Sequence, residues 1–465
     1  MKDEQMTEKL SEGGEMQERE PAADFKKAPR GVIGSEEVRQ AAQVLQKYKE
    51  GKANLEQRII GNEQWYKLLH WGQLRKEGKA GGDVEPASAW LFNSIANKHA
   101  DAMDSYPKPN VLPREEGDRE DAKMLSSVLP VILERNGFEQ VYSDVWWYKL
   151  KSGTGVYGVF WNPRLENGLG DIDIRKLDLL NLFWEPGISD IQKSRNLFSV
   201  ELLDNKVMES RYPMLKGKLG GDAIDVARYI YDDAVDTADK TVVVDWYYKN
   251  EDESGKALLH YVKFAGDTVL FASENEPEYR NRGFYDHGEY PVVFDTLFLE
   301  EGTPAGFGYI DIMRDAQGYI DRLGGAILKN NLVGAKPRFF IKDTASINEE
   351  EFADTAKDFV HVAGQLSEEN LRQITVEPVS SAALNVLQMK IDELKETSGN
   401  RDFSQGSTAS GVTAASAIAA LQEAGSKLSR DMNKSGYRAF QKINYLCIEL
   451  IRQFYDEPRS FRITG

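Results

Sequence analysis

The stretch from Ser404 to Asp431 constrains the fold more than any other part of the chain, because almost all of its side chains are small. Gln405 to Gly411 is rich in glycine, serine and threonine and cannot bury a core, which indicates a loop that is mobile or held by a partner. From Val412 the composition changes to good helix formers. Such a helix can pack closely against another copy of itself. A surface loop that leads into a buried alanine-rich helix is the alternative, and this stretch alone leaves both open.

Two further helices are predicted upstream. Tyr309 to Val333 has apolar residues on one face at helical spacing, and Ser381 to Thr397 has an apolar seam. Gly318, Gly324 and Gly325 weaken the first helix by about 1 kcal/mol each relative to alanine, a cost that goes with close backbone packing or a bend. The apolar residues of the two helices are Ile310, Met313, Ile320, Leu323, Ile327 and Leu328, then Leu384, Leu387, Ile391 and Leu394.

A compact insertion, Ala335 to Val379, separates these two helices and is predicted to fold as a small α/β unit. Lys336 to Lys342 and Arg372 to Val376 are the expected strands. A capping box precedes the expected helix from Asn348 to Val360. About 45 residues are marginal as a separate unit, so we expect neighbouring copies to stabilise this one.

The region before Tyr309 is predicted to mix helices with antiparallel hairpins. Ser35 is the expected N-cap of its first helix, and Pro130 is expected to bend a later one. The expected helices run from Ser35 past Gln57, then Trp90–Met103, Asp118–Asn136 and Phe138–Lys151. The expected strands are Val156–Asn162, Asp171–Leu177, Thr241–Tyr248, His260–Phe264 and Thr268–Phe271.

The order of helix, α/β insertion, helix, loop and long small-residue helix resembles the portal proteins of tailed bacteriophages. Two phrases add to the resemblance: Thr408–Ala417 (TASGVTAASA) at the loop and long helix, and Gly153–Asn162 (GTGVYGVFWN) at a junction of helix and strand. The resemblance covers most of the chain and implies an α+β portal-type fold. The first expected part of the chain is a disordered acidic arm, which its charge and its lack of apolar periodicity predict. The parts that the resemblance implies are a mixed α/β wing, stem helix 1, a clip, stem helix 2, a tunnel loop, and a long wing helix with the start of a short or truncated crown. With the arm first, these parts correspond to residues 1–30, 31–308, 309–333, 334–379, 380–398, 399–413 and 414–465.

The resemblance implies a ring of copies, usually twelve, at one vertex of the capsid in the virion, assembled in the host cytoplasm. Double-stranded DNA passes through such a ring without sequence preference when the genome is packaged and ejected. The implied partners are further copies of the chain, the terminase large subunit, head-completion or adaptor proteins, and the major capsid and scaffolding proteins, with no membrane. The implied role is that of a conduit and docking surface, not of an enzyme, and it needs no cofactor.

Three sets of candidate site residues follow from the resemblance. The tunnel loop presents one arginine and one aromatic ring per copy to passing DNA, and its residues are Asn400, Arg401, Asp402, Phe403, Ser404 and Gln405. In stem helix 2, Lys390 and Lys395 either line the channel or form surface pairs with acidic neighbours. The clip contacts the packaging motor and the adaptors through candidates that an ordinary solvated helix face would also explain. They are Lys336, Arg338, Glu349, Glu350 and Asp354.

The net charge of −17 argues against a protein that grips DNA through its phosphates, because such proteins carry basic faces. An acidic wall repels phosphates and suits a channel in which DNA slides, but many cytoplasmic proteins are acidic as well. The single cysteine, Cys447, lies in an apolar helical run and excludes an intrachain disulfide. No apolar run reaches the roughly 18 residues of a membrane span and no signal peptide is recognised, which predicts a soluble protein.

Other motifs give weaker hypotheses. Residues 153–158 (GTGVYG) spell the dinucleotide fingerprint, but that fingerprint needs a strand before it and a helix after it. The predicted order here is the reverse, so a nucleotide-binding enzyme is a distant alternative. Residues 286–289 (DHGE) offer ligands for a divalent ion, although a polar loop cluster is the favoured interpretation. The nearer alternative function is a ring, scaffold or adaptor component of a phage-like particle that packages no DNA.

Overall fold

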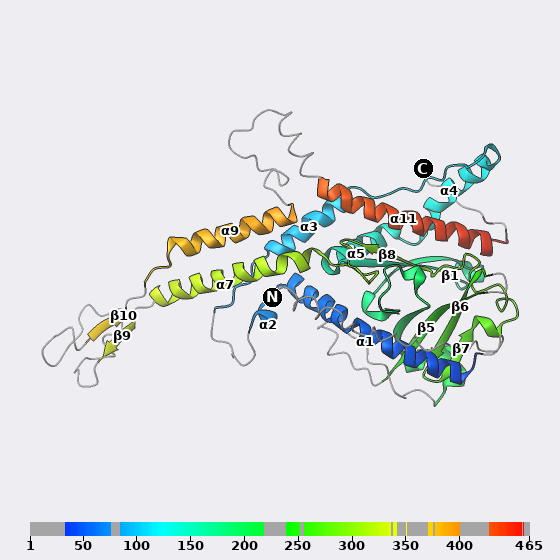
Figure 1. The fold of residues 1–465 in the computed structure, drawn as a ribbon, viewed down its shortest axis with the longest axis horizontal. Helices are drawn as coiled ribbons and strands as arrows, with labels where there is room; N and C mark the ends of the chain where they lie inside the picture. The colour runs from blue at the N-terminus through cyan, green and yellow to red at the C-terminus, as the bar shows by residue number, and fades with distance from the viewer. Residues whose placement is uncertain are drawn as a thin grey trace, which may run out of the picture.

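The computed structural model describes residues 33–75, 84–217, 239–251, 255–335, 338–341, 350, 371–374, 377–399, 427–457 and 459, with the side chains of 338–341, 371–374, 427 and 428 excepted. Figure 1 shows an elongated molecule, in which helices and sheets form a body at one end and two long helices project from it. The mixture of helices with antiparallel sheets confirms the predicted α+β class.

The helices of the body follow the predicted order closely. They are α1 (Ser35–Tyr66), α2 (Trp71–Leu74), α3 (Trp90–Met103), α4 (Arg119–Arg135), α5 (Phe138–Ser152) and α6 (Asn205–Arg211), of which α2 and α6 were not predicted. The predicted N-cap of α1 is wrong by one residue. Gly34 occupies the cap, and its N–H donates to Glu37 Oε2 at 2.8 Å, so Ser35 is the first helical residue.

Two antiparallel sheets complete the body. The smaller has the order β2–β1–β8 and the larger the order β3–β4–β5–β6–β7. The strands are β1 (Thr154–Asn162), β2 (Asp171–Leu177), β3 (Leu182–Trp184), β4 (Asn196–Asp204), β5 (Lys240–Glu251), β6 (Ala257–Ala265), β7 (Thr268–Ala272) and β8 (Val292–Thr296). All five predicted strands are confirmed to within a few residues, whereas β3, β4 and β8 were not predicted.

The two largest apolar cores lie on opposite sides of the larger sheet, and a smaller cluster packs around Met208 and Val243. The larger core joins the helices to the small sheet and contains the buried side chains of Trp146, Ile310 and Cys447. Burial raises the pKa of the Cys447 thiol to about 12, in keeping with the predicted buried cysteine. The second core lies between α1 and the larger sheet and includes Leu45 and Phe198. The position of α1 is therefore fixed by a sheet that forms later in the chain.

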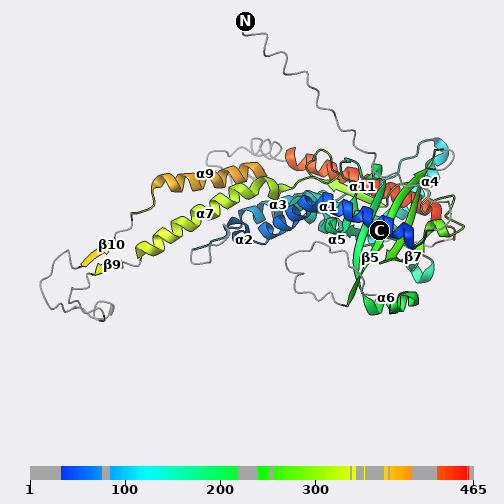
Figure 2. The same cartoon turned by 60° about the horizontal axis from the view of Figure 1, so that its bottom comes forward.

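The two projecting helices are α7 (Tyr309–Ala335) and α9 (Ser381–Ser398), which lie side by side and are called the projecting hairpin below (Figures 1 and 2). Both predicted helices are confirmed, and α7 extends two residues beyond the prediction. At the far end β9 (Arg338–Ile341) pairs antiparallel with β10 (Leu371–Ile374). The expected helix from Asn348 to Val360 lies outside the described residues, apart from Glu350.

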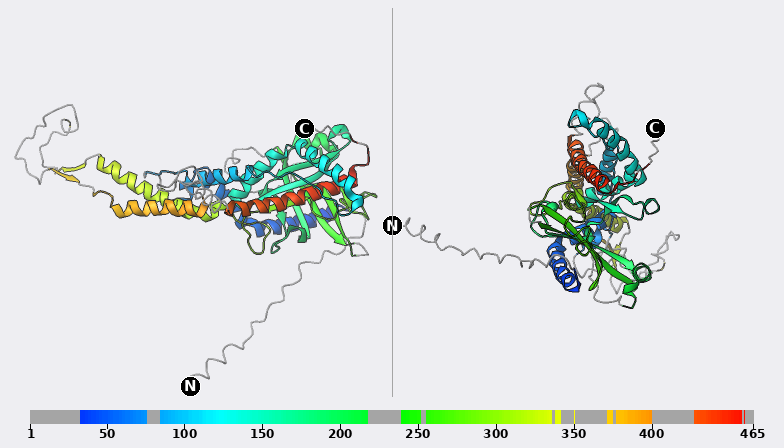
Figure 3. Two further views of the ribbon diagram at one scale, coloured as in Figure 1. Left: turned by 90° about the horizontal axis from the view of Figure 1, so that it is seen from above. Right: turned by 90° about the vertical axis from the view of Figure 1, so that its right-hand side faces the viewer.

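The last helix, α11 (Lys427–Phe454), runs back along the body, on the side opposite to α1 (Figures 1 and 3). It confirms the second part of the expected long helix, while residues 400–426 lie outside the described residues. Its inner face is buried in the larger core through Ile443 and Leu450. The chain therefore leaves the body through α7 and comes back to it through α9 and α11.

Candidate functional site

The glycine sequence at residues 153–158 forms a packed turn and not a nucleotide site. α5 precedes it and β1 follows it, as predicted, which is the reverse of the order that the fingerprint needs. Gly153 ends α5 with a φ of +88°, and a Cβ added there would lie 2.3 Å from the carbonyl carbon of Phe307. A Cβ on Gly155 would lie 2.3 Å from a Val145 methyl group. These glycines are present because neighbouring segments already fill the space.

The polar residues at 286–289 pair with their neighbours. Asp286 forms an ion pair with Arg282 at 2.5 Å, which holds the pKa of that carboxyl below its usual range. The Glu289 N–H donates to His287 Nδ1 at 3.0 Å, and burial lowers the pKa of His287 to about 4. Within the part of the chain that the structure describes, no three His, Cys, Asp or Glu side chains are grouped as metal ligands would be.

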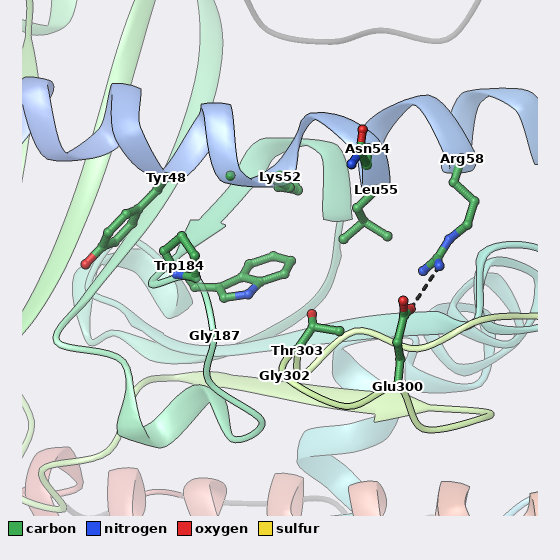
Figure 4. A pocket seen from close by; sticks show the side chains of 12 residues that line it. Tyr48, Lys52, Asn54, Leu55, Arg58, Trp184, Gly187, Glu300, Gly302 and Thr303 are labelled. Carbon is green, nitrogen blue, oxygen red and sulfur yellow. Dashed lines mark hydrogen bonds and ion pairs between the residues drawn. The ribbon is translucent and has the colours of Figure 1, made fainter. Parts of the chain in front are cut away.

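A pocket of about 330 Å³ lies between α1 and the loops that follow β3 and β8 (Figure 4). Leu55 and Trp184 provide apolar walls. At one end Arg58 donates to Glu300 at 2.8 Å, and a second guanidinium nitrogen donates to the Gly306 carbonyl oxygen at 2.8 Å. Arg58 and Glu300 thus neutralise each other, which leaves neither group free to bind a charged substrate.

Lys52 also lines this pocket, but its ammonium group is held by the backbone. Nζ donates to the carbonyl oxygens of Leu179, Leu180 and Leu182 at 2.5, 3.1 and 2.8 Å, and Glu56 is 3.5 Å away. Burial lowers the pKa of Lys52 to about 8, and the nearby Glu56 carboxylate opposes that effect. Lys52 therefore anchors α1 to the turn before β3.

A buried polar cluster holds α7 where this helix leaves the body. His70 Nδ1 lies 2.5 Å from Asp321 Oδ2, and His70 Nε2 lies 2.9 Å from the carbonyl oxygen of Trp65. Asp321 also accepts hydrogen bonds from the Ser88 N–H and from Gln317 Nε2, each at 3.0 Å. The cluster ties α7 to the chain that follows α1 and precedes α3.

Two glycines bring the body into direct contact with α7 near the same cluster. A Cβ on Gly318 would lie 3.1 Å from Leu74 Cδ2, and one on Gly325 would lie 2.9 Å from the Val84 carbonyl oxygen. The predicted close packing is therefore confirmed at these two positions. Gly324 differs, because a Cβ there would be 3.9 Å from the nearest neighbouring atom, an ordinary contact.

Past Gly325 the face of α7 that the body covers continues as an exposed apolar strip. Leu328 and Leu332 follow Gly325 by three and seven residues and therefore share its face. They are 45% and 55% exposed. The apolar face of α7 is thus longer than the part of the body that covers it.

α9 has a covered seam on one side and a second exposed apolar strip on the other. Leu387 and Leu394 belong to the seam and pack in the larger core, as predicted, whereas Leu384 is 50% exposed. Val386 and Met389 lie on the other side of the helix and are 41% and 56% exposed. The hairpin therefore presents apolar side chains on two different outer faces.

The two lysines predicted as site residues on α9 point in different directions. Lys390 Nζ donates to Glu393 Oε2 at 2.6 Å and lies 5.6 Å from the centre of the Tyr319 ring on α7. Lys395 Nζ lies 5.5 Å from the Trp90 ring on α3. Residues five apart on an α-helix are separated by about 140° around its axis. One lysine therefore borders α7, and the other borders the body.

Most of the other predicted site residues lie outside the described residues. These are Lys336, Glu349, Asp354 and all of residues 400–405. At the far end of the hairpin, Arg338 lies in β9 opposite Ile374 of β10, and Glu350 is exposed. α9 ends at Gly399, which has a left-handed φ of +69° and begins the expected tunnel loop.

The fold defines a class of protein in which an α+β body carries a projecting helical hairpin with two exposed apolar faces. The model of the family described as phage P22-like portal protein matches residues 99–297 and 299–465. The chain belongs to this family. No curated protein matches it. Among the helices within the described residues, none combines the length and the apolar character that crossing a bilayer requires.

Proposed function

We propose that this chain is the portal of a tailed phage, a ring of copies at one capsid vertex through which double-stranded DNA enters and leaves. The observation that carries the proposal is the pair of exposed strips on the projecting hairpin, Leu328 with Leu332 and Val386 with Met389. A closed ring needs a head-to-tail interface, in which one surface of a copy meets a different surface of the next. Two unlike strips on different outer faces meet that need.

The strips supply part of the association energy. Complete burial of an aliphatic or methionine side chain stabilises by about 1.5–3 kcal/mol. The four side chains are about half exposed, so their burial between two copies contributes roughly 3–6 kcal/mol. Association costs at least about 4 kcal/mol in lost translation and rotation. The seam between copies therefore gains further contacts from the bodies, and closure of the ring gives every copy two seams.

The segments of the chain have distinct roles in this proposal. Residues 31–308 form the wing, 309–333 and 380–398 the stem, 334–379 the clip and 399–413 the tunnel loop. The clip docks the terminase during packaging and adaptor proteins afterwards, through Lys336, Arg338, Glu349, Glu350 and Asp354. The loop contacts passing DNA through residues 400–405, with Arg401 and Phe403 as its charged and aromatic contacts. The family match supports these roles in general.

The directions of Lys390 and Lys395 limit how both serve the channel. Because they leave α9 about 140° apart, only one of them faces the bore squarely when the hairpins stand side by side in a ring. Lys390 already donates to Glu393 at 2.6 Å. We therefore assign each lysine one edge of α9, so that a charge change at one alters DNA passage more than the same change at the other.

The first experiment measures the mass and the symmetry of the purified protein by native mass spectrometry and negative-stain imaging. The proposal predicts a closed ring with a central hole. Leu332→Asp with Met389→Asp should abolish rings, whereas Val207→Asp with Met214→Asp, two similarly exposed apolar residues on the body, should leave them intact. A compact dimer without a hole would contradict the proposal.

A mixing experiment tests the head-to-tail arrangement itself. Leu332→Glu and Met389→Lys should each prevent assembly when present alone, because each places a charge in a seam against an apolar partner. Mixed together, the two variants can alternate around a ring, with Glu against Lys in one seam and the native strips in the next. Rings in the mixture alone support the arrangement, whereas a twofold interface between the two strips would give only a dimer in the mixture.

A further inference from the structure

The outer face of α11 carries a row of cations on a protein that is otherwise acidic. Arg430, Lys434, Arg438 and Lys442 follow one another at intervals of four residues, and all four are exposed. Residues four apart on a helix are neighbours, so the row forms a single slanting ridge, called the basic ridge below. The whole chain has a net charge of −17, so the ridge is a local reversal of sign.

The side chains around the basic ridge are polar or amphipathic. The exposed residues between Ser429 and Leu446 are Arg430, Asp431, Lys434, Tyr437, Arg438, Gln441, Lys442 and Tyr445, with no aliphatic residue among them. Protein–protein interfaces have an apolar centre with few charges. Gln441 and Tyr445 can donate hydrogen bonds to phosphate oxygens, while the Tyr437 hydroxyl donates to the Ser105 carbonyl oxygen at 3.2 Å. This face therefore suits a polyanion better than another protein surface.

The basic ridge also matches the charge spacing of a nucleic-acid backbone. Its cations are about 6 Å apart along the helix axis and extend over about 18 Å. Duplex DNA carries one negative charge per about 1.7 Å of its axis, so this length spans about five base pairs. We propose that the basic ridge of α11 binds the phosphate backbone of double-stranded DNA, without reading its sequence, on the outer surface of the body.

The proposed surface is separate from the projecting hairpin and has a rigid support. α11 lies along the body, while the hairpin extends from one end of it (Figures 1 and 3). Ile443 and Leu450 bury the inner face of α11, and Ser435 Oγ donates to Asp295 Oδ1 at 3.0 Å. Binding at the basic ridge is therefore a second contact with DNA, distinct from the DNA that a ring channel encloses.

The test measures binding of the full-length protein to a fluorescein-labelled duplex of about 20 mixed base pairs by fluorescence anisotropy. Affinity is followed between about 50 and 200 mM salt, because each neutralised phosphate adds about 0.9 to the slope of log affinity against log salt. The test variant combines Lys434→Gln, Arg438→Gln and Lys442→Gln. The control combines Lys206→Gln, Arg211→Gln and Lys216→Gln, three exposed cations in and after α6 that change the net charge equally.

The slope of log affinity against log salt should be about 2.7 lower for the test variant. The ratio of the native protein's DNA affinity to that of the test variant should therefore fall about 40-fold across this salt range. The control should retain the native slope. Equal slopes for the native protein and the test variant would overturn the inference, as would equal losses in the test variant and the control, which would indicate net charge alone. An acidic protein as the true partner would also leave the DNA slope unchanged.

Native mass spectrometry of the same samples separates this result from the proposed function. The six substituted side chains are exposed, and neither set lies on the strips of the hairpin. Rings that form without a change in DNA affinity would overturn the basic ridge and leave the portal proposal standing. If DNA affinity depends on the basic ridge but the protein forms no rings, the basic ridge is supported and the portal proposal is overturned.

Discussion

Asp321 and His70 lie 251 residues apart in the sequence, yet their side chains meet at 2.5 Å at the base of the projecting hairpin. Both side chains are completely buried. The remaining acceptor atom of Asp321 receives hydrogen bonds from Ser88 and Gln317. The pair therefore joins the direction of α7 to the packing of the chain around α2, and a change at either residue affects both.

Replacing Asp321 should strongly destabilise the protein. Asp321→Ala leaves His70, Ser88 and Gln317 without their buried acceptor, and loss of one partner of a buried pair costs about 3–5 kcal/mol. The free energy of unfolding in urea measures this cost. Asp315→Ala, on the same helix with a side chain that is 88% exposed, should change it by less than about 0.5 kcal/mol. Similar values for the two variants would contradict the role of the cluster.

Two adjacent glycines of α7 should respond to alanine with opposite signs. Gly325→Ala places a Cβ 2.9 Å from the Val84 carbonyl oxygen, so it should lower the melting temperature. Gly324→Ala meets no atom closer than 3.9 Å, so it should gain up to about 1 kcal/mol of helix propensity. Differential scanning calorimetry of both variants checks the prediction, which fails if Gly325→Ala is as stable as Gly324→Ala.

Lys52→Met should destabilise the body although it removes a charge from the interior. The methionine fills most of the space but leaves the carbonyl oxygens of Leu179, Leu180 and Leu182 without the donor they share. We expect a loss of about 1–3 kcal/mol in the free energy of unfolding, the cost of unsatisfied buried acceptors. Lys47→Met, on the exposed side of α1, is the control and should be nearly neutral. A neutral Lys52→Met would show that the carbonyl groups find other partners.

Acid should destabilise the larger sheet through His260. Burial lowers the pKa of His260 to about 4, below its unfolded value of about 6.5. The unfolded state therefore binds more protons, so stability is complete above about pH 6.5 and is lost as the pH falls towards 4. The loss approaches about 3 kcal/mol. Melting temperatures between pH 4 and 7.5 should fall less steeply for His260→Gln, which does not titrate, and an equal fall would exclude His260 as the cause.

The fold was predictable where local pattern decides the structure. α3 has the predicted bounds because its apolar periodicity ends before the prolines that follow Tyr106. β4 was not predicted because it lacks clean alternation. Its Leu197 enters the larger core and its neighbour Phe198 enters the second core, so both faces of the strand are apolar. Its pairing partner β5 also begins far along the chain at Lys240.

The candidate site was predictable to a smaller extent. The two helices of the hairpin follow from periodicity, but the cluster at its base depends on a contact between distant segments, and a lone histidine such as His70 gives no local signal. The basic ridge is different, because the spacing of Arg430, Lys434, Arg438 and Lys442 is visible in the sequence. The overall negative charge concealed it, since an average over the chain hides a local reversal.

The close contact at Gly325 also makes the rest of α7 a lever. From Gly325 to Ala335 the helix continues for about 15 Å, with α9 beside it. A tilt of 10° at the last contact with the body would move the end of α7 by roughly 2.6 Å, about half a helical turn. A small rearrangement around α2 would thus be magnified at the end of the hairpin, so the close packing at Gly325 sets the accuracy with which the distant end of α7 is placed.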